Sequence, residues 1–98
     1  MPKFLIEVRH EPEVVACAKV VRVFLTSGSH FLTNAEWGCY DGDHRAWMIV
    51  DVANKAEARA IVPPGLRSDA TVVGLNHFGL AEIDEILKRH NAAPRDSQ

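Results

Sequence analysis

The stretch HFLTNAEWGCYDGDHRAWMIVDV, residues 30–52, decides the predicted fold. Two segments of alternating apolar and polar residues flank the pair Asp41-Gly42, and such a pair is the strongest short-range signal for a β-hairpin with a two-residue type I′ turn. With this turn, Trp37 lies opposite Ala46 and every second cross-strand pair is mainly apolar. A three-residue turn would mix the two faces, because a slip of one residue moves each side chain to the other face.

The segments on either side of the hairpin alternate between strand and helix patterns. Residues 3–10 alternate with a period of two, whereas the apolar residues between Pro12 and Gly28 recur every three or four positions. Asn54 and Glu57 resemble a capping box at the start of a short helix, and prolines 63 and 64 end it. In chain order we predict strand 3–10, helix 12–28, strands 30–40 and 43–52, helix 54–62, strand 70–78 and helix 80–90.

This order predicts a single α+β domain over residues 1–90, followed by a polar tail at 91–98 that we expect to be disordered. One hairpin between two crossovers gives a ferredoxin-like βαββαβ antiparallel sheet with a C-terminal helix. Both main helices then cover one face of the sheet. The open face presents Leu5, Glu7 and Arg9 from the first strand, Leu32, Asn34 and Glu36 from the second, Trp47, Ile49 and Asp51 from the third, and Val72 and Asn76 from the fourth. This mixture is too apolar to be left in water, which predicts a C2 homodimer through the open face.

The block at residues 28–58 carries a resemblance to a known family. With Trp37, the strand end at Asp51 and the helix start at Glu57, it resembles the dimeric α/β barrel superfamily, and its layout is nearest to small muconolactone isomerase-like proteins. The resemblance implies that two sheets face each other around a cavity where a ligand sits. Other branches of this superfamily include cofactor-free monooxygenases, haem-degrading enzymes and stress-responsive proteins.

The open face also supplies candidate site residues. A carboxylate beside apolar walls can act as a proton-transfer base, and a neighbouring donor can stabilise an oxyanion. We predict Glu36 as the base, Arg9 as the donor and His30 as a second acid or base near the cavity mouth. The predicted ligand-binding residues are Glu7, Leu32, Asn34, Trp47, Ile49 and Asp51.

The function predicted from this set is binding of a small, aromatic-derived organic molecule, with isomerisation or oxidation that needs no cofactor. The alternative is a non-catalytic ligand-binding or stress-responsive dimer, in which the same polar groups form intersubunit hydrogen bonds and ion pairs. Trp47 fits either a dimer core or a platform for an aromatic substrate.

The two cysteines predict neither a disulfide framework nor a metal site. Cys17 lies in an apolar helix pattern, which indicates a small core side chain. Cys39 faces His44 in the predicted register, and a thiol beside an imidazole can bind a metal. No third ligand is visible in the sequence, and His10 reads as an ordinary surface or capping residue, so we predict no metal.

Charge and hydropathy exclude other classes. Lysine and arginine number 11 against 13 acidic residues, with no basic run, which argues against nucleic-acid binding. The longest apolar run falls far short of the roughly 20 residues that a membrane span needs. The N-terminus lacks the features of a signal peptide, so we expect a cytoplasmic protein without a membrane partner.

Overall fold

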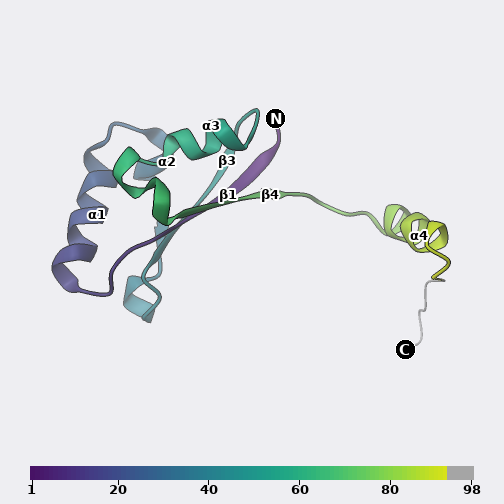
Figure 1. Ribbon diagram of the computed structural model, residues 1–98, viewed down its shortest axis with the longest axis horizontal. Helices are drawn as coiled ribbons and strands as arrows, with labels where there is room; N and C mark the ends of the chain where they lie inside the picture. The colour runs from purple at the N-terminus through teal and green to yellow at the C-terminus, as the bar shows by residue number, and fades with distance from the viewer. Residues whose placement is uncertain (93–98) are drawn as a thin grey trace.

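The computed structural model describes residues 1–92 and shows an α+β fold around one antiparallel sheet (Figure 1). Its elements in chain order are β1 (Lys3–Arg9), α1 (Val14–Thr26), α2 (His30–Thr33), β2 (Glu36–Trp37), η1 (Cys39–Asp41), β3 (Arg45–Asp51), α3 (Lys55–Ile61), η2 (Pro64–Asp69), β4 (Ala70–Leu75) and α4 (Leu80–Arg89). The predicted βαββαβ order with a C-terminal helix is therefore confirmed. From residue 93 onward, the predicted tail lies outside the described residues.

The sheet has the strand order β2-β3-β1-β4, with every neighbouring pair antiparallel. The predicted hairpin register is confirmed, because Glu36 pairs with Trp47 and Trp37 pairs with Ala46. The first three helices gather on one side of the sheet, and the other face carries no helix of the described chain (Figure 1).

The core lies between the sheet and the helices. Strand alternation turns Ile6, Val8 and Val50 inward, where they are fully or almost fully buried. Phe24 of α1 meets them, and its ring lies 4.8 Å from that of Trp37. Most of the apolar stripe predicted for α1 stays near the surface, since Val14 is 83% exposed and Leu25 is 57% exposed.

The first half of the predicted second strand is wrong, because residues 30–33 form the short helix α2. Gly28 turns the chain at a φ of 78°, and the Ser29 hydroxyl then accepts the N–H of Leu32 as an N-terminal cap. This turn carries Leu32 into the core, where it is 3% exposed, and not onto the open face.

The turn of the hairpin also differs from the prediction. A type I′ turn needs a positive φ at both central residues, but among Asp41 and Gly42 only the glycine has one, at 82°. The chain instead winds through η1, with the Asp41 N–H donated to Gly38 and the Gly42 N–H to Cys39. The Asp43 N–H also returns to the Gly38 carbonyl, which closes the loop.

The faces of β4 are the reverse of the prediction. Val72 pairs with Ile6 and is buried, whereas Val73 pairs with Leu5 and is 46% exposed. Val73 and Leu75 therefore lie on the open face. The periodicity of an apolar strand cannot distinguish its two faces, and here the register with β1 decides.

The last helix stands apart from the rest of the structure. Residues 76–79 continue outward from β4, and α4 lies at the far end of this arm (Figure 1). Among the described helices, none is long and apolar enough to cross a membrane.

Candidate metal centre

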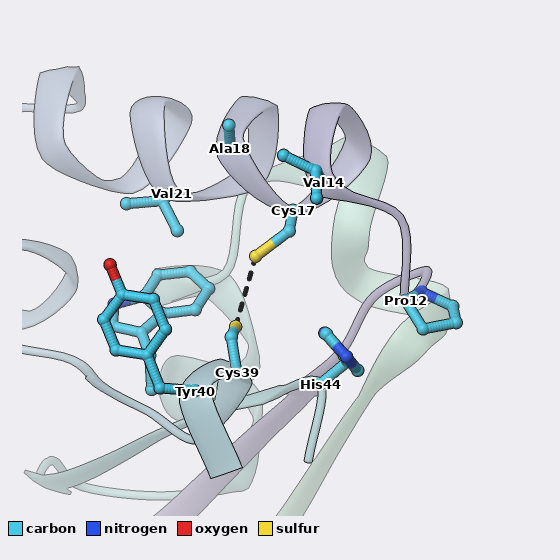
Figure 2. Close-up of a pocket in the computed structure, with 9 residues that line it drawn as sticks. Pro12, Val14, Cys17, Ala18, Val21, Cys39, Tyr40 and His44 are labelled. Carbon is cyan, nitrogen blue, oxygen red and sulfur yellow. Dashed lines mark hydrogen bonds between the residues drawn. The ribbon is translucent and has the colours of Figure 1, made fainter. Parts of the chain in front are cut away.

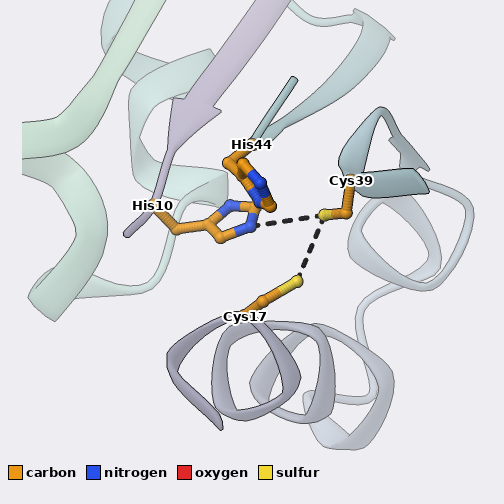
Figure 3. A group of neighbouring side chains, drawn as sticks. All are labelled: His10, Cys17, Cys39 and His44. Carbon is orange, nitrogen blue, oxygen red and sulfur yellow. Dashed lines mark hydrogen bonds between the residues drawn. The ribbon is translucent and has the colours of Figure 1, made fainter. Parts of the chain in front are cut away.

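One end of the sheet brings together two imidazoles and two thiols. His10, Cys17, Cys39 and His44 each direct one potential ligand atom inward, and these four atoms all lie within 4.8 Å of one another (Figure 3). All four side chains are partly buried. A cluster of two Cys and two His is a donor set typical of structural zinc sites.

The two histidines are held together by the pairing of β1 with β3. Arg9 pairs with Arg45 at the end of the ladder, and the His10 N–H donates to the His44 carbonyl at 3.1 Å just beyond it. The two rings are consequently 5.6 Å apart and perpendicular.

The two cysteines come from elements on either side of these histidines. Glu13 caps α1 by accepting the N–H groups of Val15 and Ala16, which fixes where the helix begins. Cys17 follows one turn later, with its own N–H donated to the Glu13 carbonyl. Cys39 opens η1, so the winding of the hairpin loop points its sulfur toward α1 (Figure 3).

The polar atoms of the cluster already contact one another, but not all of them are satisfied. The Cys17 thiol donates to Cys39 Sγ at 3.2 Å, and His10 Nε2 lies 3.3 Å from the same sulfur. The Nδ1 atoms of His10 and His44 are buried without a hydrogen-bond partner. Buried polar atoms are rarely left unpaired, so these two nitrogens have room for a further hydrogen-bond partner, whereas the nitrogen of His10 that faces the sulfurs is Nε2.

The spacing of the ligand atoms suits a tetrahedral ion after small movements. Zinc bonds of about 2.3 Å to sulfur and 2.0–2.1 Å to nitrogen place neighbouring ligand atoms roughly 3.3–3.8 Å apart. The two contacts to Cys39 Sγ, at 3.2 and 3.3 Å, are close to this range. The widest pair is within 4.8 Å, a difference that small side-chain rotations can remove.

Burial shifts the pKa values of two members of the cluster, His10 and Cys39. Burial lowers the pKa of His10, and the neighbouring His44 lowers it further. Burial raises the pKa of the Cys39 thiol, with a further contribution from its hydrogen bond with Cys17. Without a metal, burial therefore favours the neutral form of the His10 imidazole and the protonated form of the Cys39 thiol. An ion that binds thiolates would have to displace their protons.

The nearby acidic residue Asp43 is already engaged. Arg45 donates to both of its carboxylate oxygens, one of them from Nε at 2.5 Å, and this ion pair lowers the pKa of Asp43. The same carboxylate keeps the pKa of Arg45 above its usual value. The Asp43 carboxylate is thus already paired and is not a free donor for an ion in the cluster.

A groove of about 450 Å³ leads to the cluster (Figure 2). It runs between α1 and η1, and its walls are mainly apolar. Its lining residues are Pro12, Val14, Cys17, Ala18, Val21, Trp37, Cys39, Tyr40 and His44. Three of the four cluster residues are thus reachable from one side, which gives an ion a path into the site.

The predicted site residues on the open face fall into two groups. In the first, Glu7 Oε1 accepts hydrogen bonds from Trp47 Nε1 at 3.0 Å and from Arg45 at 3.1 Å. Arg9 Nη1 lies 3.9 Å from Oε2 of the same Glu7 carboxylate. Glu36 pairs with Trp47 across the hairpin, but its side chain is exposed.

The second group lies around the other half of β3. His30, Asn34, Ile49 and Asp51 line a shallow pocket of about 340 Å³ together with Phe31 and Met48. His30 and Asn34 reach it from α2 and not from a strand. Leu32 is in neither group because it is buried in the core.

Sequence reasoning found half of the metal cluster. It placed Cys39 opposite His44 but assigned Cys17 to the core and His10 to the surface. The position of His10 could have indicated its partner. His10 directly follows β1 and His44 directly precedes β3, so continuing the β1–β3 ladder by one residue places the two histidines side by side. The approach of Cys17 depends on how α1 packs, which no local pattern specifies.

Comparisons with known proteins give no further guide to this site. No protein-family model matches the chain, and neither the curated proteins nor the solved structures contain a match.

Proposed function

We propose that this chain binds one transition-metal ion through His10, Cys17, Cys39 and His44, and that the ion is Zn²⁺. The observation that carries this proposal is the convergence of four soft or borderline donors within 4.8 Å. Two thiolates balance the charge of a divalent zinc ion, and two neutral imidazoles complete a tetrahedron.

Four protein ligands indicate a structural role for the ion and not a catalytic, hydrolytic one. Catalytic zinc sites usually keep one position open for water, whereas closed four-ligand sites stabilise a fold. Here the ion would join the β1–α1 connection and α1 to the hairpin loop. These segments line an open groove, so the ion would add a direct link between them.

Copper(I) is the competing ion, because it also prefers thiolate and imidazole ligands. It favours lower coordination numbers, whereas here both imidazoles and both sulfurs offer a ligand atom within 4.8 Å of the others. For this reason zinc is the ion that we propose.

Metal analysis of untagged protein tests this function. After reconstitution with zinc and dialysis, the chain should retain one zinc per chain, and so should Asp41→Asn, which removes an exposed carboxylate near the cluster. Cys17→Ser and Cys39→Ser should each retain much less. Cobalt(II) substitution should give the intense visible spectrum of a tetrahedral thiolate site. An unmodified chain that keeps no zinc, or cysteine variants that keep it fully, would contradict the proposal.

A second candidate function concerns the open sheet face. We propose that two copies of this ferredoxin-like domain assemble through these faces as a dimeric α/β barrel that binds a small organic molecule. The supporting observation is the Glu7 carboxylate, which Trp47 and Arg45 hold beside Arg9 at the floor of the face. Such an arrangement suits a polar ligand with an aromatic part.

Thermal-shift measurements with small aromatic acids and lactones test the second function. A ligand of this face should raise the melting temperature of the unmodified chain and not that of Trp47→Ala. If no compound shifts the melting temperature, the proposed ligand binding is contradicted and the face would serve only as a dimer interface. Turnover that persists fully in Glu36→Gln would remove that residue as the base.

A further inference from the structure

The position of α4 makes a single copy of this chain far from compact. The radius of gyration is 18.0 Å and the longest dimension is 53 Å, whereas a compact chain of this length has a radius of gyration of about 12–13 Å. The difference comes from the arm at residues 76–79, which carries α4 away from the sheet (Figure 1).

This helix has an apolar side that no element of residues 1–92 buries. Leu80, Ile83, Ile86 and Leu87 recur at three- and four-residue spacing, and no residue of α4 is buried. A helix of 10 residues is too short to be stable alone in water, where about 12–15 residues are marginal. It therefore needs a surface to pack on.

The open sheet face offers a matching surface, which we call the apolar patch: Leu5, Ile49, Val73 and Leu75. Leu5 of the central strand β1 pairs with Ile49 on one side and with Val73 on the other, so three apolar side chains form a row across the sheet. Ile49 is 63% exposed, Val73 46% and Leu75 36%. The polar group around Glu7 lies in the next row and stays outside the patch.

The dimensions of the two surfaces agree. A 10-residue helix is about 15 Å long. Seven-residue strands span roughly 23 Å, and four neighbouring strands extend over about 14 Å between the outermost two. One helix thus fits on the face, and little apolar surface would remain beside it.

We propose that α4 of each copy packs on the apolar patch of a second copy, in a reciprocal exchange about a two-fold axis. This inference rests on the pairing of two copies through their open faces proposed above, but α4 would lie between the two sheets and would replace their direct packing around a ligand. Leu75 ends the edge strand β4 within the patch, and the chain continues from there away from its own sheet (Figure 1). The extended arm delivers the helix outward to a neighbour, and two-fold symmetry lets each copy give one helix and receive one.

Two single variants at solvent-accessible positions test the exchange. Ile49→Lys places a charge in the patch, and Ile83→Glu places one on the apolar side of α4. Neither residue is buried in a single copy, so both variants should keep the sheet and helices α1–α3 in circular dichroism. They should lose at most the signal of the 10-residue helix α4, which has no surface to pack on in a monomer. Light scattering after size exclusion should give a dimer for the unmodified chain and a monomer for each variant. Ala81→Glu, which adds the same charge on the opposite side of α4, should remain a dimer.

Mixing the two variants distinguishes exchange from folding back within one chain. In a mixed dimer, the intact α4 of Ile49→Lys meets the intact patch of Ile83→Glu, and the two altered surfaces face each other as a lysine and a glutamate. The mixture should therefore regain the dimer mass, which helices docked on their own sheets could not do.

Each other result overturns the proposal in a recognisable way. A monomeric unmodified chain would remove the dimer and the exchange together. An unmodified dimer that survives Ile83→Glu would leave the dimer but remove α4 from it. Loss of the dimer in Ile83→Glu but not in Ile49→Lys would place α4 on another surface, such as the groove beside α1. Variants that stay monomeric when mixed would exclude reciprocal exchange.

Discussion

The sulfur atoms of Cys17 and Cys39 lie 3.2 Å apart, although 22 positions separate the two residues in the chain. A disulfide would bring them to about 2.05 Å, so the two thiols are in contact and not bonded. One sulfur comes from α1 and the other from the hairpin loop, and His10 Nε2 joins them at 3.3 Å from Cys39. The contact joins the crossover helix to the hairpin loop, beside the packing of Phe24 of α1 on Trp37 of β2.

Removing one imidazole should abolish stabilisation by zinc. A ligand present at 100 times its Kd stabilises the folded state by about 2.7 kcal/mol. In a domain of this size, that should raise the melting temperature by roughly 10–20 °C. We expect this rise in the unmodified chain and in His30→Gln, which changes an exposed histidine outside the cluster, and a much smaller one in His44→Gln. Calorimetry with and without zinc measures this rise in melting temperature. An equal rise in His30→Gln and His44→Gln would argue against His44 as a ligand.

Without metal, the two thiols should form a disulfide with a mild oxidant. Oxidised glutathione would accept the two electrons: both thiols lose their protons, one Cys17–Cys39 bond forms, and two molecules of reduced glutathione are released. Intact mass spectrometry should show a loss of about 2 Da in the metal-free chain. Zinc-loaded chain should resist, because thiolates held by the ion are not free to attack. Equal oxidation of both forms would show that the metal does not use these sulfurs.

The parts of the fold that could be predicted are those specified by local patterns. Alternation in β1 and β3 identified the buried side chains, and the Trp37–Ala46 register followed from keeping one face of the hairpin apolar. The same reasoning failed at β4, where Val72 and Val73 are chemically equivalent and only their pairing with β1 decides which of them is buried.

The cluster of His10, Cys17, Cys39 and His44 depends on contacts between distant segments, so half of it could not be predicted from the sequence. Cys39 and His44 belong to one hairpin and could be paired, although the loop between them is wound differently from the prediction. His10 and Cys17 reach them through the β1–β3 ladder and the packing of α1. A cysteine in an apolar helix pattern looks the same whether its sulfur meets a leucine or another sulfur.

Asn54→Ala should destabilise the domain by about 1 kcal/mol. The Asn54 side chain accepts the Glu57 N–H at 2.9 Å, and the Glu57 carboxylate accepts the Ala53 N–H at 3.0 Å, which makes a reciprocal cap at the start of α3. Chemical denaturation measures the loss. Lys55→Ala, at an exposed neighbouring position, serves as the control and should change the stability by less than about 0.5 kcal/mol. Equal losses in the two variants would mean that the cap contributes nothing.

Gly38→Ala should disturb both the hairpin and the metal centre. A Cβ atom at residue 38 would lie 2.7 Å from the Asp43 carbonyl oxygen and 2.8 Å from the Trp47 ring, and the backbone oxygen cannot move without opening the loop. Overpacking of this kind costs about 1–3 kcal/mol. The loop also carries Cys39 and precedes His44, so the variant should bind zinc more weakly than the unmodified chain.

Gly65→Ala is the matched control, because a Cβ there meets no atom within 4 Å. Denaturation and zinc titration of both variants should separate them on both measures. A Gly38→Ala chain with unchanged stability and zinc affinity would show that the close approach of Gly38 to Asp43 and Trp47 does not fix the loop that presents the ligands.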